Sequence, residues 1–166
     1  MRKQDTRFDL VSTRSSCAGS IDFREITKES AVMDCPLTED EIAGHEFGFF
    51  VVQKQIYRSP AVGYVACKNI DRGELPIKSD GTEQLIATVG GLYLLPNYRH
   101  KNIAPRMVRT ITAEIFVIEP EVNASVAHCN ELSAPVFRAV GYEPGEITED
   151  GKTTHQITRQ QWVDYL

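Results

Sequence analysis

The chain has 166 residues, of which 42% are hydrophobic and 25% are charged, and its formal net charge is −5 at pH 7. This composition is typical of a globular protein long enough to bury an ordinary core, and it excludes a disordered chain. No apolar run approaches the ~18 residues of a membrane span, and the first residues hold no signal-peptide core, so we expect a cytoplasmic protein without membrane contact. The negative charge argues against a protein that binds nucleic acid by neutralising phosphates, and a cationic substrate suits it better.

The four cysteines are far apart in the sequence and form no CxxC pair: Cys17, Cys35, Cys67 and Cys129. This spacing argues against both a disulfide framework and a zinc site. We therefore expect reduced thiols, mostly buried, and no bound metal.

The first part of the chain predicts short helices. We leave residues 1–19 unassigned, although RFDLV could add an edge strand, and we expect a single domain over residues 20–166. Apolar positions predict a strand over residues 20–26, with a short polar helix directly after it. Thr38 precedes acidic residues and predicts the N-cap of a second helix, which ends near His45.

The middle of the chain predicts a hairpin and a central strand. Residues 47–55 and 61–69 are rich in β-forming residues and predict two paired strands. Glycine, proline and charged residues predict a loop over residues 70–83. Residues 84–95 predict a strand that is apolar on both faces, as expected for a strand covered on both sides.

The last part of the chain alternates helices and strands. After the central strand, an amphipathic helix places apolar residues on one stripe: Ala104, Met107, Val108, Ile111, Ile115 and Ile118. A short strand over residues 122–128 should lie beside the central strand. Ser133 predicts the N-cap of a further helix, because Pro135 disfavours an earlier start. The pair Asp150-Gly151 predicts the turn of a final hairpin.

The central strand runs through a basic turn into the amphipathic helix, and this junction predicts an anion site. A helix start exposes unpaired backbone N–H groups and the positive end of a dipole equivalent to roughly half a unit charge, which binds a phosphate. Arg99, His100 and Lys101 lie directly upstream and add positive charge.

Two stretches carry a resemblance to a known family. The run LYLLPNYRHKNIA, residues 92–104, resembles motif A of the GNAT superfamily of N-acetyltransferases, which bind acetyl-CoA through a strand, a proline and Arg/Gln-x-x-Gly-x-Gly/Ala. Residues 130–142 resemble the second signature of that family, with an Asn, a small residue three positions on and a terminal Gly-Tyr in place of Gly-Phe. The order of elements matches the family over roughly residues 20–160. The resemblance implies an α/β (α+β) fold, with a mixed, mostly antiparallel, twisted sheet and helices on both faces.

The resemblance also implies a cosubstrate site. In this family the central strand diverges from its neighbour and pairs with the pantetheine arm, and the turn binds the pyrophosphate. The positions assigned to acetyl-CoA are Leu92, Leu94, Arg99, His100, Lys101, Asn102, Ile103, Ala104, Arg106, Asn130 and Phe137. The implied reaction is direct transfer of an acetyl group to an amine of a small molecule or protein, with no nucleic acid involved. A homodimer is left open.

Three residues depart from the family pattern. Asn102 replaces the usual glycine, and Asn is the residue that best tolerates a left-handed backbone after glycine. Pro105 removes one N–H from the helix start. Phe137 stands where the family has the Tyr that protonates the departing thiolate, and the strand positions Ile86, Thr88 and Gly90 offer no strong base.

The catalytic candidates that remain are Asn130 and Ser133, and Ser133 is better explained as a helix cap. Other polar residues have a structural interpretation that we prefer: packed residues for His128 and Cys129, an exposed helix end for His45 and Glu46, and a solvated loop carboxylate for Glu83. The glycine pair Gly90-Gly91 predicts either a bulge or room for the acyl group. Three functions stay open: an N-acetyltransferase, a non-catalytic CoA-binding or partner-binding module, and a structural protein that binds no CoA.

Overall fold

The computed structural model describes residues 7–32, 36–54, 60–71, 85–129 and 132–166, without the side chains of residues 127–129. Seven strands form one sheet in the order β1-β2-β3-β4-β5-β7-β6. Their bounds are β1 (Phe8–Ser12), β2 (Phe47–Gln53), β3 (Ala61–Ile70), β4 (Ile86–Leu94), β5 (Asn123–Cys129), β6 (Glu143–Ile147) and β7 (Thr153–Ile157). Neighbouring strands are antiparallel except for the parallel pair β4–β5. The mixed, mostly antiparallel sheet expected from the sequence is confirmed.

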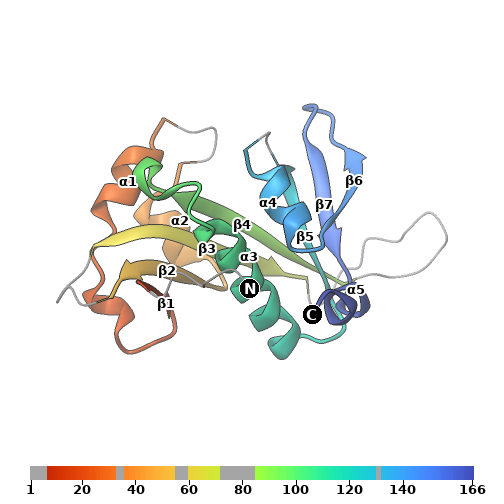
Figure 1. Cartoon of the computed structure of the whole chain (residues 1–166), viewed down its shortest axis with the longest axis horizontal. Helices are drawn as coiled ribbons and strands as arrows, with labels where there is room; N and C mark the ends of the chain where they lie inside the picture. The colour runs from red at the N-terminus through yellow and green to blue at the C-terminus, as the bar shows by residue number, and fades with distance from the viewer. Residues whose placement is uncertain (1–6, 33–35, 55–59, 72–84, 130–131) are drawn as a thin grey trace.

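Helices cover both faces of this sheet (Figure 1). They are α1 (Arg24–Ser30), α2 (Glu39–Gly44), α3 (Ile103–Ile118), α4 (Ala134–Ala139) and α5 (Arg159–Tyr165), with 3-10 turns η1 (Ala18–Ser20) and η2 (Pro96–Tyr98). The larger core lies under α3, α4 and α5 and includes Val65, Val89 and Met107. A smaller core lies under α1 and α2 on the opposite face: Ile26, Leu37, Phe50, Ala61, Tyr64, Ala66 and Tyr93. Alternate residues of β3 and β4 therefore face two separate helical layers.

The strand expected over residues 20–26 is wrong. The Asp22 carboxylate accepts the backbone N–H of Arg24 at 3.1 Å, and α1 begins at Arg24. Asp22 makes only an isolated bridge to Pro60. The apolar residues of this segment do not alternate across a sheet. Phe23 stacks on Phe50 with ring centroids 5.4 Å apart, and Ile26 lies buried on the inner face of α1.

Most other elements match the sequence. The segment RFDLV forms the edge strand β1 on β2. Thr38 caps α2, accepting the N–H of Glu41 at 3.1 Å, and α4 begins directly after Ser133. The final hairpin is β6–β7. The loop expected over residues 70–83 lies largely outside the described residues.

In the part of the chain that the structure describes, no helix is both long enough and apolar enough to cross a membrane. The same part contains no group of three or more side chains of the kinds that ligate metal. Cys67 is buried and Cys17 is exposed. Cys35 and the side chain of Cys129 lie outside what the structure describes, so the expectation of mostly buried thiols stays a prediction.

Candidate cosubstrate site at the β4–α3 turn

The central strands diverge, which leaves part of β4 without a partner on one side. β4 pairs with β5 only over residues 86–88, and the two ribbons separate beyond this point (Figure 1). The pairing of β4 with β3 shifts register between Gly90 and Tyr93, where Gly91 has a left-handed φ of 62°. A bulge of this kind bends a strand and increases its twist, so it turns the second half of β4 away from β5. The bulge predicted at Gly90-Gly91 is confirmed.

The diverging half of β4 presents backbone groups toward β5. The Leu95 N–H donates to the Val62 carbonyl of β3 at 2.9 Å. Because backbone groups alternate in direction along a strand, those of Leu94 and Leu92 point the other way, toward the gap. The Leu94 carbonyl already accepts a hydrogen bond from Arg99 Nε at 2.9 Å. Leu92 therefore offers the less encumbered groups of the two.

The turn that follows β4 has an unusual backbone. His100 and Asn102 both have left-handed φ angles, of 62° and 60°, and α3 begins at Ile103. Among the described residues, no backbone acceptor pairs with the N–H groups of residues 100–103. A left-handed residue before a right-handed one points successive N–H groups into one concavity, which binds anions. The prediction that Asn102 tolerates this conformation is confirmed, whereas nothing in the sequence indicated it for His100.

Aromatic contacts anchor the turn to the sheet. Tyr98 packs edge-on against Phe8 of β1, with centroids 5.8 Å apart, and Lys101 Nζ lies 5.6 Å from the Tyr98 centroid. Arg106 donates to the Phe8 carbonyl at 2.8 Å. Part of the Arg106 guanidinium is thus used to hold β1 in place. The roles of Arg99, Lys101 and Arg106 toward a phosphate remain predictions.

The opposite wall of the gap, formed by α4, offers no free phenol. Phe137 is only 1% exposed and packs edge-on against Tyr142, with centroids 5.1 Å apart. Thr112 Oγ1 donates to the Val108 carbonyl, so the Tyr142 hydroxyl donates to Thr112 Oγ1 at 2.7 Å. Ser133 occupies the N-cap position without a side-chain capping bond. Asn130 and the side chains of His128 and Cys129 lie outside what the structure describes.

His45 is buried, which corrects the expectation of an exposed helix end. Its side chain is 5% exposed, and Nδ1 lies 2.8 Å from the Tyr64 hydroxyl. Burial lowers the pKa of His45, and the positive charge of Lys68 lowers it further, against an opposing effect of Glu41. Burial also raises the pKa of Tyr64. No spacing or motif distinguishes this pair in the sequence, because residue 45 is brought to residue 64 only by the pairing of β2 with β3.

The His45–Tyr64 pair lies on the α1–α2 face beside the bulge of β4. A Cβ placed on Gly91 would come within 3.2 Å of the Tyr64 ring and of Leu37. One placed on Gly90 would come within 2.6 Å of the Lys68 side chain. Lys68 thus fills the space beside Gly90. Glu83, the other carboxylate considered from the sequence, lies outside the described residues.

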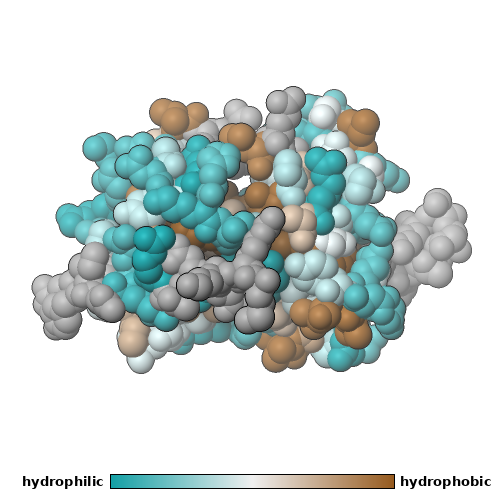
Figure 2. Space-filling model, in the orientation of Figure 1, coloured by the Kyte–Doolittle hydropathy of each residue, from teal (hydrophilic) through white to brown (hydrophobic). Residues whose placement is uncertain are grey.

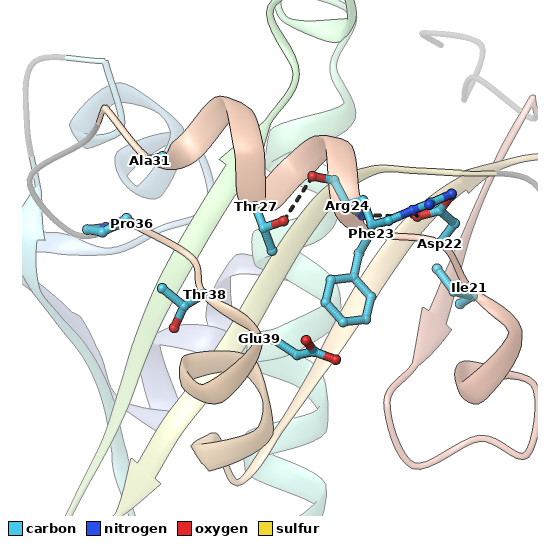
Figure 3. A pocket seen from close by; sticks show the side chains of 9 residues that line it. All are labelled: Ile21, Asp22, Phe23, Arg24, Thr27, Ala31, Pro36, Thr38 and Glu39. Carbon is cyan, nitrogen blue, oxygen red and sulfur yellow. Dashed lines mark hydrogen bonds and ion pairs between the residues drawn. The ribbon is translucent and has the colours of Figure 1, made fainter.

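Two clefts border α1, and both have the Asp22–Arg24 ion pair in their wall. One, of about 390 Å³, lies between α1 and the start of α2 (Figure 3). The other, of about 450 Å³, reaches Leu95 and Tyr98 beside the β4–α3 turn. Figure 2 also shows a hollow near the middle of the molecule with apolar side chains around it, between the β1–β4 half and the β5–β7 half.

No family model matches the sequence, and no curated protein matches it. Solved structures do match. A tyrosine-to-phenylalanine mutant of KacT is 14% identical over 96% of this chain and 99% of its own, with a TM-score of 0.66. NAA60 from Arabidopsis thaliana in complex with acetyl-CoA is 12% identical over 90% and 96%, with a TM-score of 0.58. A GNAT family acetyltransferase from Brucella melitensis in complex with acetyl-CoA is 11% identical over 91% and 87%, with a TM-score of 0.56.

These likenesses show that the chain has the GNAT acyltransferase fold, and the resemblance drawn from residues 92–104 and 130–142 is confirmed at the level of fold. Some matched chains extend well beyond this one. The chain covers 63% of a ribosomal-protein-S5-alanine acetyltransferase from Vibrio fischeri and 31% of Eis1 from Mycobacterium abscessus.

Proposed function

We propose that the protein binds acetyl-CoA at the β4–α3 turn and transfers its acetyl group to an amine. The observation that carries this proposal is the left-handed backbone of His100 and Asn102 at the start of α3. This backbone conformation would direct the N–H groups of residues 100–103 toward one point, where the dipole of α3 adds roughly half a positive charge. A pyrophosphate fits this concavity without requiring any particular side chain.

The adjacent half of β4 suits the pantetheine arm, whose amides can pair with a strand edge as an added strand would. Leu92 and Leu94 present backbone groups on that edge. Two of the matched structures, NAA60 and the Brucella acetyltransferase, contain acetyl-CoA, which supports the choice of ligand. The cosubstrate would supply an acetyl group activated as a thioester.

The chain's own residues would position the reactants rather than move protons. The Leu92 N–H would donate to the thioester carbonyl and stabilise the charge that develops there. The acceptor ammonium loses two protons as the N–C bond forms and the C–S bond breaks: one passes to solvent before attack, and the other ends on the thiolate. Ile86, Thr88 and Gly90 supply no base on β4. Activity should therefore rise with pH toward the pKa of the acceptor amine.

A second function is favoured by a specific observation on α4. Phe137 has no hydroxyl and that of Tyr142 is engaged by Thr112, so neither can protonate a departing thiolate. A CoA-binding module that keeps the turn and lacks the chemistry is consistent with this arrangement.

The two functions separate in a two-stage experiment. A thermal shift with CoA and acetyl-CoA tests binding, because a ligand of the native state raises the melting temperature. Thiol release with a panel of amines then tests transfer. Binding with thiol release supports the transferase, and binding without release supports the module. If saturating CoA and acetyl-CoA leave the melting temperature unchanged, both functions are excluded.

Substitution at the turn localises the binding. Asn102→Val disfavours the left-handed conformation more strongly than alanine does, because valine is β-branched, so we expect the free turn to relax and CoA binding to weaken at least tenfold. Asn97→Val, five residues upstream in η2, keeps a right-handed backbone and should change it less than twofold. Equal CoA affinities together with equal stabilities of the two CoA-saturated variants would place the cosubstrate elsewhere.

A further inference from the structure

Arg99 differs from the other cations of the β4–α3 turn in what its side chain contacts. Residues 97–110 contain four Lys or Arg and no acidic residue. Lys101 lies over an aromatic ring of η2, Arg106 donates to β1, and Arg109 donates to α5. The Nε of Arg99 instead donates to the Leu94 carbonyl of β4 at 2.9 Å. Arg99 therefore places a positive charge against the central strand, whereas these contacts of the other three lie on other elements.

The Arg99 contact lies on the side of β4 that faces the gap. The Leu95 N–H pairs with β3, so the carbonyl of Leu94, one residue earlier, points the other way. The guanidinium carbon lies 5.7 Å from the centroid of the Tyr93 ring, and Tyr93 is only 5% exposed. A carbonyl oxygen can accept two hydrogen bonds, but the guanidinium also fills the space beside it. A pantetheine arm that paired with Leu94 would therefore compete with Arg99 for this edge.

The same side chain begins at the proposed phosphate site. Arg99 follows η2 with an extended backbone, with φ of −71° and ψ of 158°, and it directly precedes the left-handed His100. Its Cα thus lies at the concavity of residues 100–103, while its guanidinium lies at Leu94. Rotation about the side-chain bonds can carry the positive charge from the strand edge to an anion in the concavity without moving the backbone. An arginine–phosphate contact is charge-assisted and can be bidentate, so it can replace the hydrogen bond that is lost.

We propose that Arg99 determines which acetyl donors the protein accepts, because it occupies the edge of β4 until a pyrophosphate binds. A donor with a pyrophosphate attracts the guanidinium to the concavity and frees the Leu94 carbonyl for the pantetheine arm. A donor without phosphate must break the same hydrogen bond and gains no contact in return. The protein thereby selects acetyl-CoA over thioesters on shorter arms. This inference rests on the proposed function for the position of the cosubstrate.

Acetyl-pantetheine tests the inference, because it has the thioester and the arm of acetyl-CoA and no phosphate. Isothermal titration measures the binding of both compounds to the full-length wild type and to Arg99→Ala. The matched control is Lys101→Ala, which removes the same charge from the same turn and leaves the hydrogen bond to Leu94 in place. Arg99→Lys keeps the charge but lacks the Nε donor, and it carries the test if Arg99→Ala is not folded. Circular dichroism melting establishes that each protein is folded.

Arg99→Ala should bind acetyl-pantetheine at least fivefold more tightly than the wild type, and acetyl-CoA no more tightly. Arg99→Lys should also bind acetyl-pantetheine more tightly, and it should keep more of the acetyl-CoA affinity than Arg99→Ala does. Lys101→Ala should bind acetyl-CoA more weakly and acetyl-pantetheine within twofold of the wild type. A gain for the ligand without phosphate separates this role of Arg99 from a structural one, because damage to the turn would weaken the binding of both ligands.

Unchanged, weaker or undetectable binding of acetyl-pantetheine by the folded Arg99 variants would overturn the inference. An equal gain in Lys101→Ala would also overturn it, because the effect would then come from the charge of the turn and not from the contact with Leu94. If the wild type binds no acetyl-CoA, the proposed function itself is refuted. Acetyl-CoA binding by the wild type without a gain of acetyl-pantetheine binding in the Arg99 variants refutes only the role of Arg99.

Discussion

Asn102 offers a test of the turn in which the backbone alone is perturbed. It is exposed, its side chain makes no capping hydrogen bond, and its φ and ψ are 60° and 16°. Replacing it therefore breaks no capping hydrogen bond and creates no buried cavity. The left-handed conformation is disfavoured by roughly 1–2 kcal/mol for an ordinary L-residue, less for Asn and not at all for Gly. We expect Asn102→Ala to be about 1 kcal/mol less stable than the wild type and Asn102→Gly to be within ~0.5 kcal/mol of it.

This free energy appears either in the stability of the free protein or in its CoA affinity, depending on the conformation of the turn without ligand. If the turn stays left-handed without ligand, Asn102→Ala lowers the stability of the free protein and leaves CoA affinity unchanged. If the turn relaxes, stability is kept and CoA binding weakens by about fivefold, because binding must restore the conformation. The stability of the CoA-saturated protein falls by about 1 kcal/mol in both cases, which in a chain of this length is about 2–4 °C in melting temperature.

Denaturant unfolding with and without saturating CoA measures both quantities. Asn97→Ala, in the right-handed turn η2, is the matched control and should change stability by less than ~0.5 kcal/mol. A CoA-saturated Asn102→Ala protein as stable as the CoA-saturated wild type would refute the assignment of the turn as a left-handed phosphate cradle.

Three further results are expected. As pH falls below 6.5, the usual pKa of histidine, His45 is protonated in the unfolded chain before it is protonated in the native state. The free energy of unfolding of the wild type should therefore fall by up to about 1.4 kcal/mol per pH unit relative to that of His45→Gln. Parallel curves of stability against pH for the two proteins would contradict this. Phe137→Tyr should raise thiol release roughly tenfold or more if transfer is limited by protonation of the thiolate, with Phe137→Leu as the packing control. Gly91→Ala should lower stability by ~1–2 kcal/mol, because φ at this residue is 62° and the new methyl group would meet Leu37 and Tyr64 at 3.2 Å. Gly19 has open space around it, so Gly19→Ala should be nearly neutral when both variants are compared by thermal unfolding.

The fold was predictable where local signals and global packing agree. The cap at Thr38, the strands 47–53 and 61–70 and the helix after residue 102 follow from residue types that the structure uses in the expected way. The segment at residues 20–26 failed because three apolar residues in seven satisfy a strand and a helix start equally well. In the structure the Asp22 side chain accepts the N–H of Arg24, a hydrogen bond that favours the helix start at this residue.

The candidate site also has one part that the sequence predicts and one part that it does not. The turn was predictable because Asn102 is one of the few residues that accept a left-handed backbone. His45 was not, because its burial depends on the register of β2 against β3, which places Phe47 opposite Cys67 and so brings residue 45 to the end of the Tyr64 side chain. Sequence periodicity specifies which face a residue takes on its own strand, and it does not specify which residue of another strand it meets.

Binding and chemistry depend on different properties of this chain, and for that reason one can persist without the other. The proposed cosubstrate cradle would be made of backbone N–H groups whose direction is set by φ at residues 100 and 102, so several side chains would satisfy it. In the proposed transfer, protonation of the departing thiolate would depend on a single hydroxyl, which Phe137 lacks, while its ring packs against Tyr142. Substitutions in the turn should therefore act on CoA affinity and those on α4 should act on turnover. A variant at Phe137 that changed CoA affinity as strongly as Asn102→Val would show that the two are not separable.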